Sequence, residues 1–457
     1  MLRDFFIPSV FDRPPTRLQR HAGYGQSGLA YETAQLAPSW LAPALAKLRQ
    51  PACGFRSGSK AWQARAITAW CKVAAEWKTL RFPGAKKFLV ALSATTGLSE
   101  KMLREALHNH FGVFDETRLQ KWVSRTKHRR DKHAADKVNY PELVFLIAAG
   151  NLPGVAVHPA IHLSLLGIPA VVKNASTEPL LLPAVLETLA RHDLEVAARL
   201  MALTWPRAQA DLTQTIMAHH PALAAFGDDD TIESFSRQKK RLVDFGDRFS
   251  LTLALPGVAQ SQIRKIAYDL CMFEQMGCLS PQAIFLFTDD WKEADAFCRR
   301  LAPALQRMNV TLPLRRRAPA QHAMIQQWRG ALMARAAAGE KVILLTGKGT
   351  DWTIAAATYF DLDERVAYRF ARVWPVASIR AFAEIFQRCQ NHAHVLIWGG
   401  SLNELQEFWN APELDQKFDR VRFAQTGKAQ IPNCGWLEDV NPAWRRLMCG
   451  LRLQKNI

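Results

Sequence analysis

The sequence predicts an α/β protein in which helices cover both faces of parallel sheets. The main observation is that short apolar runs alternate with helical patterns after residue 139. A helical pattern over Pro159–Leu166 separates two apolar runs, Leu143–Ala148 and Ile168–Lys173. The same succession of strand, helix and strand recurs over Phe249–Leu255, Gln260–Phe273 and Gln282–Thr288. Strands that alternate with helices in this way are typical of parallel sheets with helices on both faces.

Further apolar patterns lie within this α/β region and after it. The run Leu180–Leu203 is expected to form one long helix, and Val342–Thr346 and His394–Trp398 are expected to form two more strands. The alanine-rich run Ala331–Ala338 predicts a helix. The chain shows no internal repeat, so a solenoid is not expected.

The N-terminal part of the chain is predicted to be helical. Helical spacing is present over Ala61–Leu80 and again over Ala85–Trp122. In the first of these stretches, Trp62, Trp70 and Trp77 are interpreted as packing residues rather than as a binding platform. The helical region therefore precedes the α/β region.

Length and composition indicate a globular protein of two or three domains. The 457 residues contain no apolar run of transmembrane length, and charges and prolines interrupt the first twenty residues where a signal peptide needs an apolar core. We therefore expect a cytoplasmic protein. The eight cysteines are scattered without a CxxC pair, which argues against a zinc site and a disulfide framework.

The net charge of +18 predicts an acidic partner. The densest basic run is Lys121–Lys137, and Arg315–Arg317 forms a second cluster. Nucleic acid is one candidate partner, although the first run has a single aromatic residue, Trp122, where a single-strand binder interleaves several. A solvated helical linker is the alternative reading of that run. Coenzyme A, NADPH and acyl carrier proteins are acidic as well, and would use the same positive field.

Cys278 is the candidate nucleophile. It follows Gly277 at the end of a predicted helix, shortly before a predicted strand, with Pro281 marking the turn. A thiol presented from such a loop can face a cleft and attack a substrate. The alternative is a buried structural cysteine, because free cysteine is often a core residue.

A second candidate is Asn151, which stands in the turn Gly150–Gly154 directly after the apolar run Leu143–Ala148. Ligands of open α/β sheets bind at the ends of strands. An asparagine that only tolerates a left-handed turn is the alternative.

Four stretches in order resemble the acyl-CoA reductase family typified by the LuxC component of bacterial luminescence, a branch of the aldehyde dehydrogenase superfamily. The similarity runs from about Phe88 to about Trp436. The four stretches are Ile147–Gly154, Ala170–Ser176, Phe226–Ile232 and Glu274–Pro281. The resemblance implies an aldehyde-dehydrogenase-like fold with a Rossmann-like nucleotide-binding domain and an α/β catalytic domain. It suggests four parts, which are a helical N-terminal region with a basic linker (1–138), an NAD(P)-binding domain (139–256), a catalytic domain with Cys278 (257–425) and a C-terminal segment (426–457).

The resemblance also implies roles for individual residues. Cys278 would be the nucleophile, and Asn151 would donate its amide to the oxyanion that forms when the thiolate attacks a carbonyl. The family places the cofactor along two of the matched stretches, at Lys173, Ser176, Gly227 and Thr231, and near Gly246, which lies in a segment outside the four stretches. Thr231 is expected to begin a helix, and the aspartates before it are expected to cap that helix.

The chain departs from the family pattern at three places. Oxidising aldehyde dehydrogenases carry a glutamate before a Gly-Gly pair, whereas this chain has Asp244-Phe245-Gly246. Without that base, water would attack the acyl enzyme slowly, unless Asp244 replaces it. Asn174 stands where the family more often has Pro or Ser, and Leu437 follows Gly435-Trp436 where the family continues His-Asp-Gly.

The resemblance implies an NADPH-dependent acyl thioester reductase that forms an aldehyde through a thioacyl enzyme. NADH in place of NADPH, and acyl-CoA or acyl carrier protein as donor, remain open. An acyl-activating synthetase as partner and a homo-oligomeric state are further expectations. The alternatives are an aldehyde dehydrogenase that runs in the oxidative direction and a basic nucleic-acid-binding protein on a degenerate scaffold.

Two other motifs are discounted. The segment Gly347-Lys348-Gly349-Thr350 lacks the upstream glycine of a phosphate loop and has glycine after its lysine. The pair His158 and His162 has helical spacing but no third metal ligand nearby in the sequence. No metal is therefore expected, and His392 and His394 are read as ordinary residues.

Overall fold

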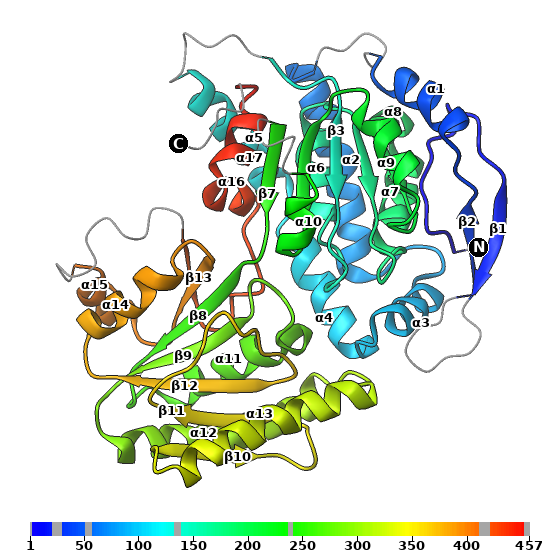
Figure 1. Cartoon of the computed structure of the whole chain (residues 1–457). Coiled ribbons are helices and arrows are strands. Elements are labelled where there is room, and N and C mark those ends of the chain that lie inside the picture. Colours follow the sequence, from blue (N-terminus) through cyan, green and yellow to red (C-terminus); the bar gives the residue numbers. More distant parts are fainter. Residues whose placement is uncertain are drawn as a thin grey trace. The chain divides into compact units, whose positions relative to one another are not determined.

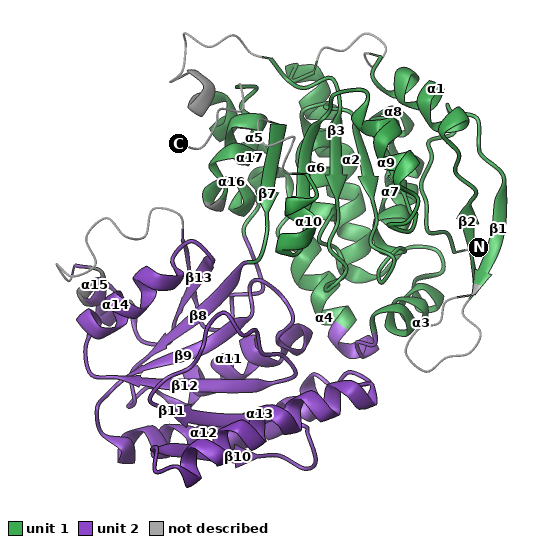
Figure 2. Ribbon diagram, viewed as in Figure 1, with its two compact units in different colours: residues 1–96, 103–247, 433–457 green, residues 97–102, 248–432 purple. Residues whose placement is uncertain are grey.

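A computed structural model describes residues 2–20, 30–50, 57–131, 139–235, 241–410 and 421–451 (Figure 1). The chain divides into two compact units, which Figure 2 shows in different colours. Unit 1 comprises Met1–Thr96, Leu103–Asp247 and Asn433–Ile457, and unit 2 comprises Gly97–Met102 and Arg248–Pro432. The N-terminal region, the predicted nucleotide-binding part and the closing segment thus share one unit. This division differs from the four parts expected from the sequence.

Unit 1 contains a five-stranded parallel sheet with the order β5-β4-β3-β6-β7. Its strands are β3 (Val144–Ile147), β4 (Ala170–Lys173), β5 (Leu200–Leu203), β6 (Ala222–Phe226) and β7 (Leu242–Phe245). The chain starts in the middle of the sheet, winds to one edge and then returns to fill the other side. The order of the strands therefore reverses between β3 and β6, and ligands of open α/β sheets bind outside the carboxyl ends of the strands at such a point.

The sheet of unit 1 is covered by helices that connect its strands. Helix α6 (Val157–Leu165) follows β3, α7 (Leu181–His192) and α8 (Leu194–Ala197) follow β4, and α9 (Ala210–Met217) follows β5. All nine residues of α6 are buried. A helix that is apolar on every side lies inside a protein, and its pattern explains why this segment shows little amphipathic contrast in the sequence.

The three predicted packing tryptophans are confirmed as core residues of unit 1. Trp62, Trp70 and Trp77 lie on α2 (Lys60–Thr79), and their side chains are fully buried. The indole N–H groups of Trp62 and Trp70 donate to the main-chain oxygen and the hydroxyl of Ser164, at 2.8 and 2.9 Å. Because each buried indole has a polar partner, these tryptophans fix α2 against α6 without leaving an orphan donor.

The N-terminal region is helical in large part, as predicted. Its helices are α1 (Pro38–Leu48), α2, α3 (Ala85–Thr96), α4 (Glu100–Phe111) and α5 (Glu116–Asp131). The region also contains an antiparallel pair, β1 (Thr16–Arg20) and β2 (Ala30–Ala34), which the sequence reading omitted. The end of the basic run Lys121–Lys137 lies outside the described residues.

One expected helix is wrong over its second half. The run Leu180–Leu203 does not form a single helix, because the chain breaks at Asp193. The backbone of Asp193 is extended, and its side-chain carboxylate caps α8 by accepting the N–H of Val196. The last residues form β5, whose four residues are all buried. Leu, Met and Ala lack the β-branched signal of a strand, so periodicity alone could not separate this buried strand from a buried helix.

Unit 2 contains a seven-stranded sheet with the order β10-β11-β12-β9-β8-β13-β14. Every neighbouring pair is parallel except β10 and β11. The strands are β8 (Phe249–Ala254), β9 (Pro281–Phe287), β10 (Val342–Thr346), β11 (Thr353–Ala357), β12 (Phe370–Val376), β13 (Ala393–Trp398) and β14 (Arg422–Gln425). The predicted strands at 249–255, 282–288, 342–346 and 394–398 are therefore confirmed.

Helices α11 (Gln260–Cys271), α12 (Trp291–Thr311), α13 (Pro319–Ala337), α14 (Ile379–Cys389) and α15 (Leu402–Trp409) complete unit 2. Aromatic packing dominates one side of its core, where Phe285 on β9 stacks on Trp374 and meets Phe382 edge-on, with ring centroids 5.2 and 5.0 Å apart. The strands β8, β9, β13 and β14 run parallel, so their amino ends lie at the same end of this sheet. Residues just before these strands therefore lie near that end of the sheet. Within the described ranges, no helix is long and apolar enough to cross a membrane.

Candidate active site

The backbone that leads to Cys278 is strained. Helix α11 ends at Cys271, and a single 3₁₀ turn, Met272–Gln275, follows. Within it, Phe273, Glu274 and Gln275 adopt left-handed conformations with φ of 56°, 55° and 64°. Each such non-glycine residue costs about 1–3 kcal/mol and persists only when its surroundings enforce it. Three such residues in succession show that contacts with neighbouring residues hold this turn in one unfavourable conformation.

Gln275 is one of the residues that enforce this conformation. Its carboxamide nitrogen donates to the main-chain oxygens of Pro281 and Phe370, at 2.8 and 3.0 Å. Its carboxamide oxygen accepts the N–H of Phe370 at 2.8 Å. The buried side chain thus ties the turn before Cys278 to the first residues of both β9 and β12.

Cys278 is held through its own main chain and is partly exposed. Its carbonyl oxygen accepts the hydroxyl of Ser250 on β8 at 2.7 Å. Among the described cysteines, only Cys71 and Cys278 are partly exposed, and the others are buried. The position of Cys278 in a loop just before β9, partly exposed, therefore fits a nucleophile better than a core cysteine.

Burial raises the pKa of the Cys278 thiol to about 11. The main-chain N–H groups of Cys278 and Leu279 and the positive charges of Arg422 and Arg248 act in the opposite direction. In this resting arrangement the thiol is protonated at neutral pH. Ionisation for attack then requires transfer of its proton to a base as the substrate binds.

Two arginines and a histidine that were not predicted as site residues lie, like Cys278, at the amino ends of strands in unit 2. Arg248 precedes β8 and Arg422 begins β14. His394 lies at an irregularity in the pairing of β13 with β8, and burial, together with Arg422 and Arg248, lowers the pKa of its imidazole to about 3. His394 is therefore neutral at physiological pH. These residues share a position at the start of a parallel strand. The sequence does not show that they lie close together, because the order of the strands in the sheet must be known first.

In unit 1, Asn151 lies exposed in the turn after β3. Its neighbour Gly150 packs against the turn that follows β4, because a Cβ on Gly150 would lie 1.9 Å from Oγ1 of Thr177. The hydroxyl of Thr177 donates to the carbonyl oxygen of Gly150 at 2.9 Å. The loop of Asn151 and the turn that carries Ser176 therefore lie side by side at the carboxyl end of the sheet, and glycine is required for this close approach.

Lys173 ends β4 and is only partly exposed. Its Nζ lies 5.4 Å from the ring centroid of Trp205, and burial, together with Arg207, lowers the pKa of its ammonium group. The next residue, Asn174, is buried and donates to the carbonyl oxygen of Asp4 and to the hydroxyl of Thr204, at 3.2 and 3.3 Å. The departure from the family at Asn174 is thus explained by its role in holding the N-terminal segment.

Gly227 and Gly246 occupy tight turns after β6 and β7. A Cβ on Gly227 would lie 2.8 Å from Cβ of Thr231, and one on Gly246 would lie 2.9 Å from a carboxylate oxygen of Asp244. The helix α10 (Asp229–Glu233) begins two residues before Thr231, which was expected to open it. Asp228 caps this helix by accepting the N–H of Thr231 at 2.9 Å, so the predicted capping by an aspartate is confirmed.

The carboxylate of Asp244 turns back onto its own loop. It accepts the N–H of Gly246 at 2.5 Å, and the carbonyl oxygen of Asp244 accepts the side chain of Asn441 at 2.8 Å. The side chain that was considered as a substitute for the missing glutamate is therefore engaged in the turn. This arrangement gives Asp244 a structural role.

His158 and His162 anchor the closing segment of the chain. The Nε2 atoms of both rings donate to the carbonyl oxygen of Cys434, at 3.0 and 2.7 Å. Their Nδ1 atoms accept the indole N–H groups of Trp436 and Trp444, both at 3.3 Å. Every nitrogen of the pair is therefore engaged in fastening α16 (Trp436–Val440) and α17 (Pro442–Met448) to α6. No group of metal-ligating side chains was found among the residues that the structure describes.

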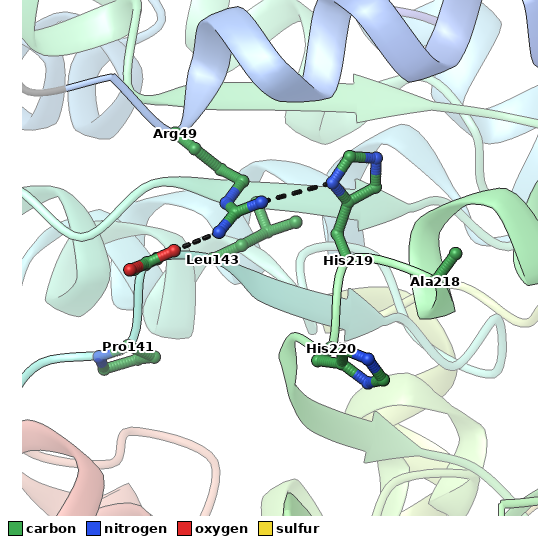
Figure 3. Close-up of a pocket in the computed structure, with 7 residues that line it drawn as sticks. Arg49, Pro141, Leu143, Ala218, His219 and His220 are labelled. Atoms are coloured by element: carbon green, nitrogen blue, oxygen red, sulfur yellow. Dashed lines mark hydrogen bonds and ion pairs between the residues drawn. The ribbon is translucent and has the colours of Figure 1, made fainter.

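A separate pocket of about 300 Å³ lies at the other end of the unit 1 sheet. Figure 3 shows Arg49 pointing toward His219, and the guanidinium lies 3.3 Å from Nδ1 of His219. The same guanidinium forms an ion pair with Glu142. The pocket is lined by residues that precede strands, Leu143 before β3 and His219 and His220 before β6. The predicted cofactor residues, in contrast, follow the carboxyl ends of strands. The pocket is therefore not part of the candidate cofactor site.

The sequence-predicted residues fall into two groups. Cys278 belongs to unit 2. Asn151 and the predicted cofactor residues belong to unit 1, where they follow the carboxyl ends of its strands: Lys173, Ser176, Gly227, Thr231 and Gly246.

Solved structures of aldehyde dehydrogenases share this fold. Aldehyde dehydrogenase 21 from Physcomitrella patens superposes with a TM-score of 0.67 at 14% identity, over 96% of this chain and 97% of that chain. Aldehyde dehydrogenase C from Pseudomonas syringae, solved with NAD⁺ and octanal, gives a TM-score of 0.64 at 12% identity, over 93% and 88% of the two chains. The predicted aldehyde-dehydrogenase-like fold is therefore confirmed.

Sequence comparison gives relatives at the family level. A long-chain acyl-protein thioester reductase from Aliivibrio fischeri is 24% identical over 174 residues. The match spans about a third of each protein, 36% of this chain and 36% of the relative. The model of the family described as acyl-CoA reductase (LuxC) matches residues 66–409, which is more than half of the chain. The chain therefore belongs to the LuxC family of acyl-CoA reductases.

Proposed function

We propose that this protein is an acyl thioester reductase that releases an aldehyde, with Cys278 as its nucleophile. The observation that carries the proposal is the presentation of a partly exposed Cys278 from a strained, tightly bonded turn in a chain of this family. Strain that is retained at one turn is typical of a site whose geometry serves chemistry.

In the proposed reaction, Sγ of Cys278 attacks the carbonyl carbon of the acyl thioester and the donor's C–S bond breaks. The donor thiol leaves with the proton that the cysteine gave up, and the acyl group remains on Cys278 as a thioester. Asn151 and the main-chain N–H of Cys278 are the proposed donors to the tetrahedral oxyanion. Hydride addition to the thioacyl group and cleavage of its C–S bond then give the aldehyde and the thiolate of Cys278, which takes up a proton from solvent to restore the thiol.

A nicotinamide cofactor supplies the hydride when it is bound. The carboxyl ends of the unit 1 strands fit such a group, because Gly150 and Gly227 make turns that any Cβ would obstruct. The half-buried cation of Lys173, with Ser176 from the turn that follows β4, is proposed to hold the ribose end. Positive charge from Lys173 and the nearby Arg207 favours a 2′-phosphate, so NADPH is the proposed cofactor and NADH the alternative.

The reductive direction is favoured over hydrolysis to an acid. The carboxylate of Asp244 accepts the N–H of Gly246, so it is not positioned to activate water. Without such a base, the thioacyl enzyme would survive long enough to be reduced.

The donor is proposed to be an acyl group on a protein or on coenzyme A. The relative from Aliivibrio fischeri is named for an acyl-protein substrate, which favours a protein-bound acyl group. The surplus of 18 positive charges suits either donor, since both acyl carrier proteins and coenzyme A are acidic. An acyl-activating synthetase as partner and a homo-oligomeric state are also proposed.

Mass spectrometry of the intact protein tests this function. The wild type, incubated with a long-chain acyl-CoA or an acyl carrier protein and no cofactor, is expected to gain the mass of the acyl group. Cys278→Ala is expected to gain none. Cys71→Ala, the variant of the other cysteine that is partly exposed among those described, should gain it as the wild type does. Addition of NADPH should discharge the adduct as aldehyde. Absence of an adduct with both donors would contradict the proposal.

A further inference from the structure

Glu274 is a fully buried carboxylate four residues before Cys278. One of its oxygens lies 2.6 Å from the guanidinium of Arg317, and the other lies 2.5 and 2.8 Å from two nitrogens of Arg369. The side chains of both arginines are almost completely buried. Removing one partner from such a group leaves uncompensated charge in the interior, so the three side chains depend on one another.

The arginines anchor Glu274 to a second strained loop. Tyr368 and Arg369 also adopt left-handed conformations, with φ of 64° and 63°. The N–H of Tyr368 donates to the carbonyl oxygen of Glu274 at 2.7 Å. Two strained segments that lie about ninety residues apart in the sequence are therefore joined by this hydrogen bond and by the ion pairs of Glu274. Each segment holds the other in its strained conformation.

The same group is fastened to the end of α12. Arg369 donates to Oδ1 of Asn309 at 2.8 Å and to the carbonyl oxygen of Leu312 at 2.6 Å. The turn before Cys278 is thus connected through Arg369 to a long helix as well as to β12. Gln275 adds its three bonds to Pro281 and Phe370 from the next position of the turn.

We infer that Glu274 is a positioning residue that sets where the thiol of Cys278 stands. The inference rests on the proposed function of Cys278 as the nucleophile. Glu274 acts by holding three consecutive left-handed residues in the one conformation from which Gly277 and Cys278 emerge. A misplacement of a reacting atom by about 1 Å can reduce a rate by roughly a hundredfold, so the precision of this turn matters to the reaction.

Glu274→Gln is the variant to test, because it keeps the shape of the side chain and removes its charge. The two arginines then lose their counter-ion, and the strained turn is expected to relax. We expect acyl transfer to Cys278 to slow by roughly a hundredfold. The KM for NADPH is expected to stay within about twofold, since Glu274 lies outside the proposed cofactor residues.

Alkylation of Cys278 by iodoacetamide provides a readout that does not depend on acyl donors. As the turn relaxes, the thiol becomes more exposed, and its pKa should fall from about 11 towards the value of a free cysteine. Peptide mass spectrometry across a pH series is then expected to show faster labelling of Cys278 at neutral pH in the variant. Labelling thus rises while acyl transfer falls.

Arg329→Gln is the matched control for a general loss of stability. Arg329 is a buried arginine of α13 whose guanidinium donates to Thr353, Gly349 and Trp352 and makes no hydrogen bond to residues 273–278. At a temperature where both variants remain folded by circular dichroism, Arg329→Gln should leave the labelling profile of Cys278 unchanged. Comparison with Glu274→Gln then isolates the effect on the turn.

The outcomes separate this inference from the proposed function. A folded Glu274→Gln protein with the labelling profile of the wild type would overturn the positioning role, whatever the acyl donor does. If the wild type forms no acyl adduct but the labelling profile of Glu274→Gln shifts as expected, the proposed function fails and Glu274 still positions the thiol. If Arg329→Gln shifts the profile equally, the role of Glu274 is not specific and the inference is wrong.

Discussion

Ser250 holds the main chain of Cys278 from the neighbouring strand, with its hydroxyl 2.7 Å from the carbonyl oxygen of Cys278. The pairing of β8 with β9 places Ser250 beside Pro281, three residues beyond the cysteine. The candidate nucleophile is therefore supported from two sides, by the sheet through Ser250 and by the strained turn through Gln275.

Ser250→Ala is expected to lower the free energy of unfolding by about 1 kcal/mol, because a buried carbonyl oxygen loses its hydrogen bond. Acyl transfer to Cys278 should slow at the same time. The matched control is Thr252→Val on the same strand, because the buried hydroxyl of Thr252 has no hydrogen-bond partner among the described residues. That variant should be as stable as the wild type or more so. Chemical denaturation measures the free energy of unfolding of both variants. Equal losses of stability in the two variants would contradict the role given to the hydrogen bond from Ser250 to Cys278.

Asn151→Ala is expected to reduce kcat by roughly a hundredfold to a thousandfold, as loss of an oxyanion donor does. The exposed position of Asn151 predicts little change in stability. Asn174→Ala should show the opposite pattern, because Asn174 is buried and its carboxamide joins Asp4 to Thr204. Its loss should cost about 1–3 kcal/mol of stability. Steady-state kinetics and thermal denaturation of the two variants distinguish a catalytic from a structural asparagine, and a normal kcat for Asn151→Ala would exclude the catalytic role.

Lys173→Met tests the proposed preference for NADPH. A charged hydrogen bond contributes about 1.5–3 kcal/mol, so the KM for NADPH is expected to rise roughly tenfold or more. The KM for NADH should rise less, because NADH has no 2′-phosphate. Lys341→Met, at an exposed lysine of unit 2, is the control and should leave both values unchanged. An equal rise for the two cofactors would show that Lys173 does not recognise the 2′-phosphate.

The sequence revealed the strands whose residues are β-branched or aromatic and missed those built from small residues. The runs that became β8 and β9 were recognisable, whereas β6, with the sequence ALAAF, was not. Strand β12 was hidden because it contains Arg372 and Pro375. The guanidinium of Arg372 is buried and donates to the carbonyl oxygen of Gln282, a partner that only the folded sheet provides.

The candidate site shows the same limit. Cys278 and Asn151 were predicted because each stands in a recognisable local motif. The proposed role of Glu274 depends on Arg369, which lies 95 residues away in the sequence. The proximity of Arg248 and Arg422 to His394 depends on the order of the strands in unit 2. Local patterns identify groups that carry chemistry, but long-range contacts decide which residues position them.

His162 and Asp269 predict opposite responses of stability to pH. His162 is buried between Trp122 and Trp444, and burial lowers its pKa from 6.5 to about 3. Below pH 6.5 the unfolded chain binds a proton that the folded chain excludes. The contribution of His162 should therefore fall by about 1.4 kcal/mol for each pH unit between about 6 and 4.

Asp269 responds in the other direction. Its carboxyl group is buried and accepts the N–H of Gly427 at 2.6 Å, and burial raises its pKa from 3.8 to about 7. The folded chain therefore binds this proton more tightly than the unfolded chain. The contribution of Asp269 to stability is fully present below pH 3.8 and is lost as the pH rises towards 7, by about 1.4 kcal/mol for each unit.

Urea denaturation from pH 4 to pH 7 of the wild type, His162→Asn and Asp269→Asn measures both effects as differences from the wild type. The stability of the wild type relative to His162→Asn should decrease as the pH falls, and its stability relative to Asp269→Asn should increase. Buried groups that lie far from the substituted residue are common to all three proteins, so their titration cancels in the differences. His158 is the exception, because it shares the carbonyl oxygen of Cys434 with His162 and His162 lowers its pKa, so the slope for His162→Asn reports the pair. Slopes of the same sign in the two comparisons would show that at least one of these side chains is hydrated in the folded protein, because only burial separates its folded from its unfolded pKa in the direction stated.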